Sequence, residues 1–91
     1  MVTKKKLNII IFGASGSIGS FLLKKYFDKK YNLLLFIKDK RKINNLIKKY
    51  KSNGTQIIKY ETIDFSNPKN FKKKFKKNKN FIHKTNIIIN T

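Results

Sequence analysis

Short apolar runs alternate along this chain with segments whose apolar side chains recur every three or four residues. The runs have the length of strands and lie at residues 7–12, 33–37, 56–62 and 87–89, the third being the least apolar. The intervening segments carry apolar residues at helical spacing: Ile18, Phe21, Leu22 and Tyr26, then Ile43, Leu46, Ile47 and Tyr50, and finally Phe71 and Phe75. This pattern predicts a βαβαβαβ chain.

The apolar runs also predict how the strands are arranged. Unbroken apolar strands are typical of burial on both faces, which favours a parallel sheet with flanking helices, an α/β fold. Right-handed crossovers favour the strand order third, second, first, fourth. Thr91 directly follows the fourth strand, whereas such sheets usually continue. We therefore expect an incomplete sheet of about four strands, with residues 1–91 forming the N-terminal part of a single, truncated domain and residues 87–89 at an exposed edge.

Two turn signals mark expected helix boundaries. Asn53-Gly54 is typical of a helix end and predicts that the second helix stops there. Asn67-Pro68 predicts the start of the third helix, with Ser66 or Asn67 as the N-cap residue.

Lysine dominates the charge of the chain. All 23 basic residues except Arg41 are Lys, and with only 4 acidic residues the formal net charge is +19. Such a charge suggests polyanion binding, but specific recognition of phosphates and bases relies mainly on Arg. We interpret the lysines as a solvated coat and expect no specific nucleic-acid partner. A basic polyanion-binding protein is the alternative.

Two compositional features bear on where the protein works. The chain has no Cys, which excludes disulfides and Cys-based zinc sites and fits a reducing cytosol. No stretch approaches the roughly 20 apolar residues of a membrane span. We expect a cytoplasmic protein without a membrane partner.

A glycine-rich turn joins the first strand to the first helix. Gly13, Gly16 and Gly19 follow the spacing G-x-x-G-x-x-G, a relative of the dinucleotide fingerprint G-x-G-x-x-G. Glycines let the backbone approach a ligand, and a helix start offers free N–H groups that favour phosphate. We expect the N–H groups of Ser17 and Ile18 to donate to a pyrophosphate. A structural turn without a ligand is the alternative.

Residues 12–19 resemble the Thr-Gly-Ala-Ser/Thr-x-x-x-Gly turn of the short-chain dehydrogenase/reductase superfamily, with Ser15 at the Ser/Thr position. The glycine spacing is similar to that of extended and atypical members. Phe12 replaces the usual Thr, and Ser17 stands where single-domain members have their middle glycine. The resemblance implies a Rossmann-like, NAD(P)-binding domain of an oxidoreductase. Such an enzyme would transfer hydride between nicotinamide and a carbonyl or hydroxyl carbon of an unknown small-molecule substrate.

Two later positions extend the resemblance. Asp64-Phe65 is similar to the family's Asp-hydrophobe pair, in which the aspartate meets the adenine amino group and the next residue lies against the base. Asn90 matches the first Asn of the family's Asn-Asn-Ala-Gly motif, and Thr91 departs from the second. A turn carboxylate at Asp64 and a strand-end turn residue at Asn90 are the alternatives.

The residues after the second strand bear on the choice of cofactor. Basic residues at this point hold the 2′-phosphate of NADP, whereas an acidic residue accepts from the ribose hydroxyls of NAD. Lys38 lies in line with the basic residue of NADP-binding members, and Arg41 adds a second cation. Asp39 points the other way. We expect NADP, with NAD as the alternative cofactor and membership of the Lys coat as the alternative interpretation of Lys38.

We expect no catalytic residue within this chain. The spacing Tyr26 to Lys30 matches the family's Tyr-x-x-x-Lys, but it lies in the first helix, away from the strand ends where ligands bind. The family's catalytic residues would come after residue 91, so the isolated chain would be inactive. His83, the single His, is expected at the surface and excludes a His-based metal cluster. A non-catalytic nucleotide-binding regulator is a further alternative, and the protein could form homo-oligomers.

Overall fold

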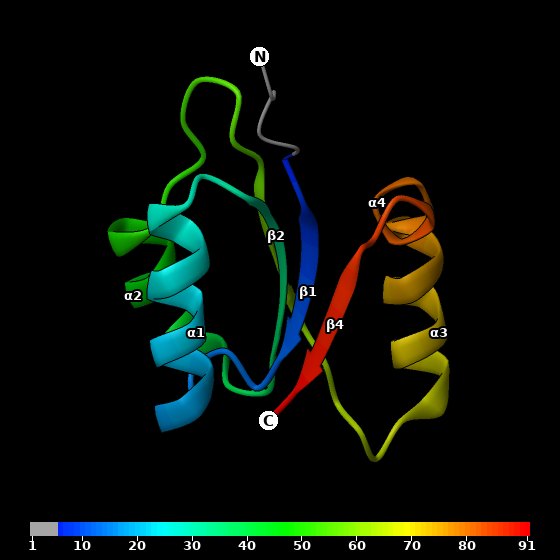
Figure 1. Ribbon diagram of the computed structural model, residues 1–91. Helices are drawn as coiled ribbons and strands as arrows, with labels where there is room; N and C mark the ends of the chain where they lie inside the picture. The colour runs from blue at the N-terminus through cyan, green and yellow to red at the C-terminus, as the bar shows by residue number, and fades with distance from the viewer. Residues whose placement is uncertain (1–5) are drawn as a thin grey trace.

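The computed structural model describes residues 6–91. Four strands and four helices follow one another in the order β1 (Asn8–Phe12), α1 (Ser17–Asp28), β2 (Asn32–Ile37), α2 (Lys40–Lys49), β3 (Ile58–Thr62), α3 (Pro68–Lys77), α4 (Lys79–His83) and β4 (Ile87–Asn90) (Figure 1). The alternation predicted from the apolar pattern is confirmed. None of the helices in residues 6–91 is long and apolar enough to cross a membrane.

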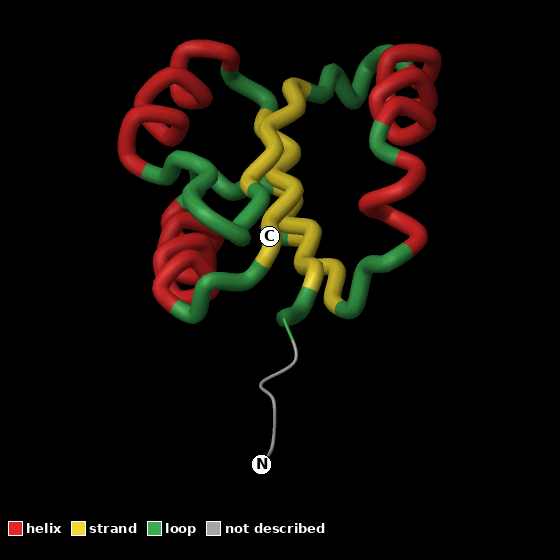
Figure 2. The backbone as a smooth tube through the Cα atoms, turned by 90° about the horizontal axis from the view of Figure 1, so that it is seen from above, coloured by secondary structure: helices red, strands yellow, loops and turns green. Residues whose placement is uncertain are grey.

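The strands form one parallel sheet in the order β3-β2-β1-β4. Ile10 of β1 lies between Leu34 of β2 and Ile88 of β4, which fixes the register. Helices α1 and α2 cover one face, and α3 and α4 cover the other, so that the sheet separates two groups of helices when seen from above (Figure 2). The predicted strand order and α/β class are therefore confirmed.

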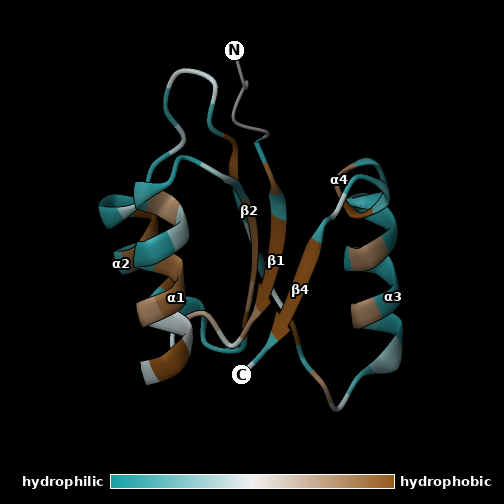
Figure 3. Ribbon diagram, viewed as in Figure 1, coloured by the Kyte–Doolittle hydropathy of each residue, from teal (hydrophilic) through white to brown (hydrophobic). Residues whose placement is uncertain are grey.

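The two central strands are buried on both faces. On the α1–α2 side, Ile9 and Ile11 pack with Leu33 and Leu35, while Ile10 faces the α3–α4 side, all without measurable exposure. Burial of each such side chain contributes about 1.5–3 kcal/mol, so β1 and β2 hold most of the stabilising apolar area. Figure 3 shows β1, β2 and β4 coloured mainly as hydrophobic.

Phenylalanines join α3 to the sheet. The ring of Phe12 stacks on that of Phe36 at 4.8 Å between centroids, and Phe71 stacks on Phe75 at 5.1 Å. Phe36 also lies 6.2 Å from Phe75, so one aromatic cluster spans the two strands and the helix. Phe71 and Phe75 share a face of α3, as predicted. Phe12, which replaces the usual Thr of the turn that residues 12–19 resemble, packs in this cluster.

The face of α1 that packs on the sheet differs in part from the predicted one, since Tyr26 packs against the core but Ile18 and Phe21 do not. The exposed fractions of Ile18 and Phe21 are 68% and 70%, whereas Gly19 and Leu23 are buried. The reason is the close approach of Gly19 to the turn that precedes the helix. The helix rotates so that its smallest residue meets the backbone, which carries Ile18 and Phe21 outward.

The helix boundaries are set by local hydrogen bonds. Asn67 caps α3 by accepting from the Asn70 N–H, and Pro68 is its first residue, so Asn67 is the N-cap. Asn78 ends α3 and separates it from the short α4, a break that the apolar pattern did not predict. The prediction that α2 ends at Asn53-Gly54 is wrong, because α2 ends at Lys49 and these two residues form the turn before β3.

A buried carboxylate ties α3 to the edge strand β3. Glu61 is almost fully buried, and its oxygens lie 3.2 Å from Lys74 Nζ and 3.4 Å from Lys77 Nζ. The side chain of Asn78 donates to the same carboxylate at 3.3 Å. Burial raises the pKa of Glu61, but the hydrogen bonds and the two ammonium groups outweigh it and leave the pKa below its usual value.

Candidate functional site

The chain reverses direction sharply where β1 leads into α1. The Gly13 N–H donates to the Phe36 carbonyl at 3.0 Å, and the Gly16 N–H donates to the Gly13 carbonyl at 3.0 Å. The Ser20 hydroxyl, one turn into the helix, donates to the Ala14 carbonyl. These bonds hold the turn against the sheet and fix where the helix begins.

Two of the turn glycines are required by the fold itself. Gly13 has φ +79°, a left-handed conformation that disfavours other residues, and a Cβ there would lie 2.6 Å from Thr91 Oγ1. A Cβ on Gly19 would lie 2.1 Å from the Gly13 carbonyl oxygen. Neither position tolerates a side chain, whether or not a ligand binds.

Gly16 is different, because the backbone does not require a glycine there. Its φ of −75° and ψ of 171° are accessible to any residue. A Cβ would meet only the Gly13 carbonyl oxygen, at 3.4 Å, which is an ordinary contact. Because glycine has no side chain, Gly16 leaves the start of α1 uncovered.

The first turn of α1 presents free donors beside a cavity. Within residues 6–91 the N–H groups of Ser17 and Ile18 donate to no oxygen, and the first turn carries no acidic residue. The cavity, about 320 Å³, is lined by Gly13, Gly16, Ser17, Ile18 and Thr91. Unpaired donors at the positive end of a helix dipole favour an anion.

Ser15 and Gly19 do not line this cavity. Ser15 is half-buried within the turn, and Gly19 is buried against the backbone of Gly13 and Ala14. Thr91 does line it, and its hydroxyl donates to the Phe12 carbonyl at 2.8 Å and to the Gly13 carbonyl at 3.2 Å. Sequence reasoning noted Thr91 only as a departure from a motif, although its place after a strand beside β1 could have signalled this contact.

A second cavity opens beyond the ends of β2 and β3. It measures about 270 Å³ and is lined by Lys38, Lys40, Thr62, Ile63, Asp64 and Asn70. Two predicted site residues, Lys38 and Asp64, thus come together from separate strands. Four further lining residues were not singled out, because only the folded arrangement brings the start of α2, the end of β3 and the start of α3 together here: Lys40, Thr62, Ile63 and Asn70.

Asp64 stabilises a turn and also lines this cavity. One of its oxygens accepts from the Ser66 N–H at 3.0 Å and from the Ser66 hydroxyl. These two bonds, with a smaller effect of the Lys38 charge, hold the pKa of Asp64 below its usual value. The other oxygen accepts no hydrogen bond from residues 6–91, so the group remains available as an acceptor. Phe65 is exposed and does not line the cavity.

Asp39 and Arg41 interact with each other. Asp39 caps α2 by accepting from the Arg41 N–H at 2.9 Å, which lowers the pKa of the carboxyl. The Arg41 side chain is 92% exposed, with Nε 3.5 Å from Asp39. Arg41 does not line the second cavity, so its expected place beside an adenosine ribose stays a prediction.

Asn90 ends β4 opposite Phe12, at the same edge of the sheet. Its side chain is exposed and lines neither cavity. Asn90 therefore contacts neither cavity, and its role in cofactor binding stays a prediction. The lining residues of both cavities follow the carboxyl ends of the strands, where ligands of open parallel sheets bind. These strand ends lie at one edge of the sheet (Figure 1).

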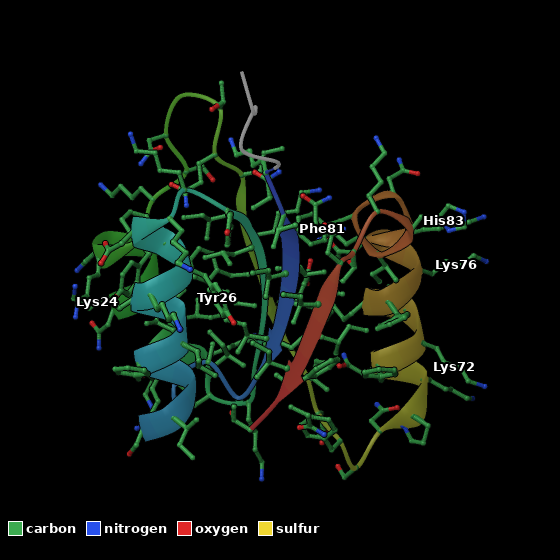
Figure 4. The ribbon with its side chains drawn as sticks, viewed as in Figure 1. Lys24, Tyr26, Lys72, Lys76, Phe81 and His83 are labelled. Carbon is green, nitrogen blue, oxygen red and sulfur yellow. The ribbon has the colours of Figure 1, made fainter. Side chains whose placement is uncertain are left out.

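Other residues considered from the sequence have structural or surface positions. Tyr26 packs against the core with its ring 6.0 Å from that of Tyr31, and Lys30 is exposed after the end of α1. His83 is exposed on α4 (Figure 4). Residues 6–91 contain no group of three His, Cys, Asp or Glu side chains that could hold a metal ion.

No protein-family model matches this sequence, and no curated protein matches it. Solved structures with the same fold include a protein assigned as a 3-oxoacyl-reductase from Bacillus thuringiensis, with TM-score 0.76 and 14% identity over 96% of this chain. The MalC Reductase/Diels-Alderase from Malbranchea aurantiaca is similar, with TM-score 0.74 and 16% identity over 96% of this chain. The match covers 35% and 36% of those chains, so this chain spans about a third of their length. At these identities the likeness shows the fold, which is Rossmann-like.

Proposed function

We propose that this chain binds the ADP portion of NADP, with NAD as the alternative cofactor, within an oxidoreductase. The observation that carries the proposal is Gly16. Its side chain is missing where the backbone has no need of a glycine, directly beside unpaired N–H groups of α1. A ligand that must approach these N–H groups accounts for that glycine.

The residues present fit a dinucleotide. Its diphosphate would accept from the N–H groups of Ser17 and Ile18 in the first cavity, between Gly13 and Gly16. Its adenosine would occupy the second cavity, where the free oxygen of Asp64 can accept from an amino group. When bound, the cofactor supplies the nicotinamide that exchanges hydride.

The charges around the second cavity favour a phosphorylated ribose. Lys38 and Lys40 line it, and both are exposed at the surface, where they can contact a phosphate. Asp39, the acidic residue that would accept from ribose hydroxyls, caps α2 and does not line this cavity. NADP therefore fits these residues better than NAD.

The reaction class rests on more distant support. Both structures with the same fold are named as reductases, which agrees with an oxidoreductase at a coarse level. The proposed reaction is hydride transfer between nicotinamide and a carbonyl or hydroxyl carbon. The proposed catalytic residues come after residue 91, so residues 1–91 alone are expected to bind the cofactor without turning over substrate.

The test is Gly16→Ser, with NADPH binding measured by calorimetry and unfolding by urea denaturation. Serine is a better N-cap than glycine by a few tenths of a kcal/mol, so the stability is expected to stay equal or rise slightly. The added side chain covers the N–H donors of α1. NADPH affinity is therefore expected to fall by about tenfold or more, which is comparable to the loss of a charge-assisted hydrogen bond.

Asn44→Ser on the exposed surface of α2 is the matched control, because Asn44 lines neither cavity. It is expected to leave NADPH binding unchanged. Equal NADPH affinity of Gly16→Ser and the unmodified chain would contradict the proposal. A third outcome is that neither Gly16→Ser nor the unmodified chain binds NADPH, while both bind duplex DNA in a salt-dependent way. In that case the Lys coat is a polyanion-binding surface instead.

A further inference from the structure

A third cavity lies on the helical layer formed by α3 and α4. It measures about 320 Å³ and is lined by Phe71, Lys72, Phe75, Lys76, Lys79, Ile82 and His83. It shares no residue with the two cavities at the carboxyl edge of the sheet. We call this cavity the α3–α4 groove.

The groove combines an apolar floor with a basic rim. Phe71, Phe75 and Ile82 pack against the core beneath it and leave part of their surface open. Lys72 and Lys76 are exposed and point away from the sheet, as does His83 at the far end (Figure 4). An apolar surface bordered by cations is complementary to a molecule with a hydrophobic body and an anionic head.

None of the 4 acidic residues of the chain lines this groove. Asp28 pairs with Lys24, Asp39 with Arg41, and Glu61 with Lys74 and Lys77, while Asp64 accepts from Ser66. The basic rim therefore has no acidic partner among the residues that line the groove, which favours an anionic ligand.

We infer that the α3–α4 groove binds a medium-chain alkyl carboxylate. The alkyl chain would lie on Phe71, Phe75 and Ile82, and the carboxylate would meet Lys72 and Lys76, which are neighbours one helical turn apart. This inference goes beyond the proposed dinucleotide site and does not depend on it.

The dimensions and charge favour this occupant over others. The cavity is near the lower end of the roughly 300–1,000 Å³ range of small-ligand sites, which suits one short tail. A second copy of the chain would bring another charge of +19 against the same lysines. The floor residues carry no side-chain hydrogen-bonding group to orient a base or a sugar, which disfavours a nucleotide.

The experiment measures binding of sodium decanoate to the full chain by calorimetry and by shifts of the Phe71 and Phe75 ring protons. Saturable binding is expected. Affinity should fall from decanoate to octanoate to butyrate, by about two- to fourfold for each methylene removed, because each contributes buried apolar area. Lys72→Gln with Lys76→Gln should weaken decanoate binding about fivefold or more, through loss of two surface charge contacts.

The matched control is Lys69→Gln with Lys73→Gln. It has the same helix, spacing and change of charge, but neither residue lines the groove. Decanoate affinity should stay within about twofold of the unmodified chain, since only distant screened charges change. An equal loss in both pairs, or equal affinity for butyrate and decanoate, would show general attraction to the Lys coat and overturn the inference.

Two further outcomes decide the identity of the occupant. Binding to anionic phospholipid vesicles without binding to decanoate would overturn it in favour of a membrane surface. NADPH affinity reports separately on the first and second cavities, which lie at the carboxyl ends of the strands. Loss of decanoate binding by Lys72→Gln with Lys76→Gln, at unchanged NADPH affinity, supports a groove independent of that site.

Discussion

The Cα of Gly19 lies so close to the carbonyl oxygen of Gly13 that a Cβ added to Gly19 would be 2.1 Å from that oxygen. The same Cβ would be 2.9 Å from the Cα of Ala14. Backbone therefore meets backbone at the point where α1 crosses the end of β1. This contact sets the rotation of the helix and leaves Ile18 and Phe21 at the surface.

Gly19→Ala is expected to destabilise the protein, although alanine is normally the better helix former. Helix propensity favours alanine by about 1 kcal/mol. The overpacking against Gly13 is expected to reverse that sign and give a net loss of about 2 kcal/mol, because both partners are backbone and cannot move aside. The urea midpoint of unfolding measures the change. Gly16→Ala, which meets no such contact, is the control, and a Gly19→Ala midpoint at or above its value would contradict the geometry.

Lys38→Gln with Lys40→Gln is expected to reduce the preference for NADPH over NADH. Both residues line the second cavity, and each contact to a 2′-phosphate would be charge-assisted. The ratio of the two dissociation constants should change by about tenfold, mainly through weaker NADPH binding. Lys42→Gln with Lys48→Gln changes the net charge equally outside the cavity. If the ratio is unchanged in the variant Lys38→Gln with Lys40→Gln, the 2′-phosphate binds elsewhere or the cofactor is NAD.

Glu61→Gln is expected to cost about 1–2 kcal/mol of unfolding free energy. The substitution removes the partner of Lys74 and Lys77, but both ammonium groups can reach water, which limits the penalty. Asp28→Asn is the control, because the Lys24–Asp28 pair is exposed and contributes little. Denaturant unfolding at neutral pH compares the two variants, and equal losses would mean that the Glu61 contacts add no stability.

The stability that Glu61 contributes is expected to depend on pH. Its pKa is lower in the folded protein than the ordinary value of 4.5, so folding favours the ionised form. The contribution is complete above the ordinary pKa and is lost as the pH falls through the lower pKa of the folded state. The difference in unfolding free energy between the unmodified chain and Glu61→Gln should therefore shrink below about pH 4.5. A difference that stays constant from neutral pH to acid would contradict this assignment.

Asn67→Ala is expected to destabilise α3 by about 1 kcal/mol, the usual cost of losing an N-cap. The side chain accepts from the Asn70 N–H at 3.3 Å and shares this donor with the Asn67 carbonyl at 3.1 Å. Asn45→Ala makes the same change inside α2, where helix propensity favours alanine. Thermal unfolding should therefore shift in opposite directions for the two variants. A shift in the same direction would indicate that Asn67 does not act as a cap.

Much of the fold could be predicted because it follows from local patterns. Leu33, Leu34 and Leu35 are consecutive and apolar, and in a run this short they are typical of a strand buried on both faces. Asn67-Pro68 carries its own helix-start chemistry within two residues. The place of the glycine turn was also predictable, because a strand, a turn and a helix follow one another without a gap.

The remaining features depend on contacts between distant segments. The face of α1 is decided by the fit of Gly19 against Gly13, which outweighs the apolar stripe of Ile18 and Phe21. At the break between α3 and α4, the side chain of Asn78 donates to Glu61 of β3, 17 positions earlier in the chain. Lys40 resembles any other lysine until the ends of β2 and β3 bring it beside Asp64. Contacts of this kind between distant segments cannot be predicted from composition or residue spacing.

The Gly13 carbonyl connects three parts of the molecule. It accepts from Gly16 within the turn and from the hydroxyl of Thr91 at the end of β4, and it lies against Gly19 in the helix. A shift of β4 along the sheet would therefore pull on the same oxygen that shapes the start of α1. The mouth of the first cavity is thus mechanically coupled to the last strand, and whatever holds β4 in register also sets the width of that mouth.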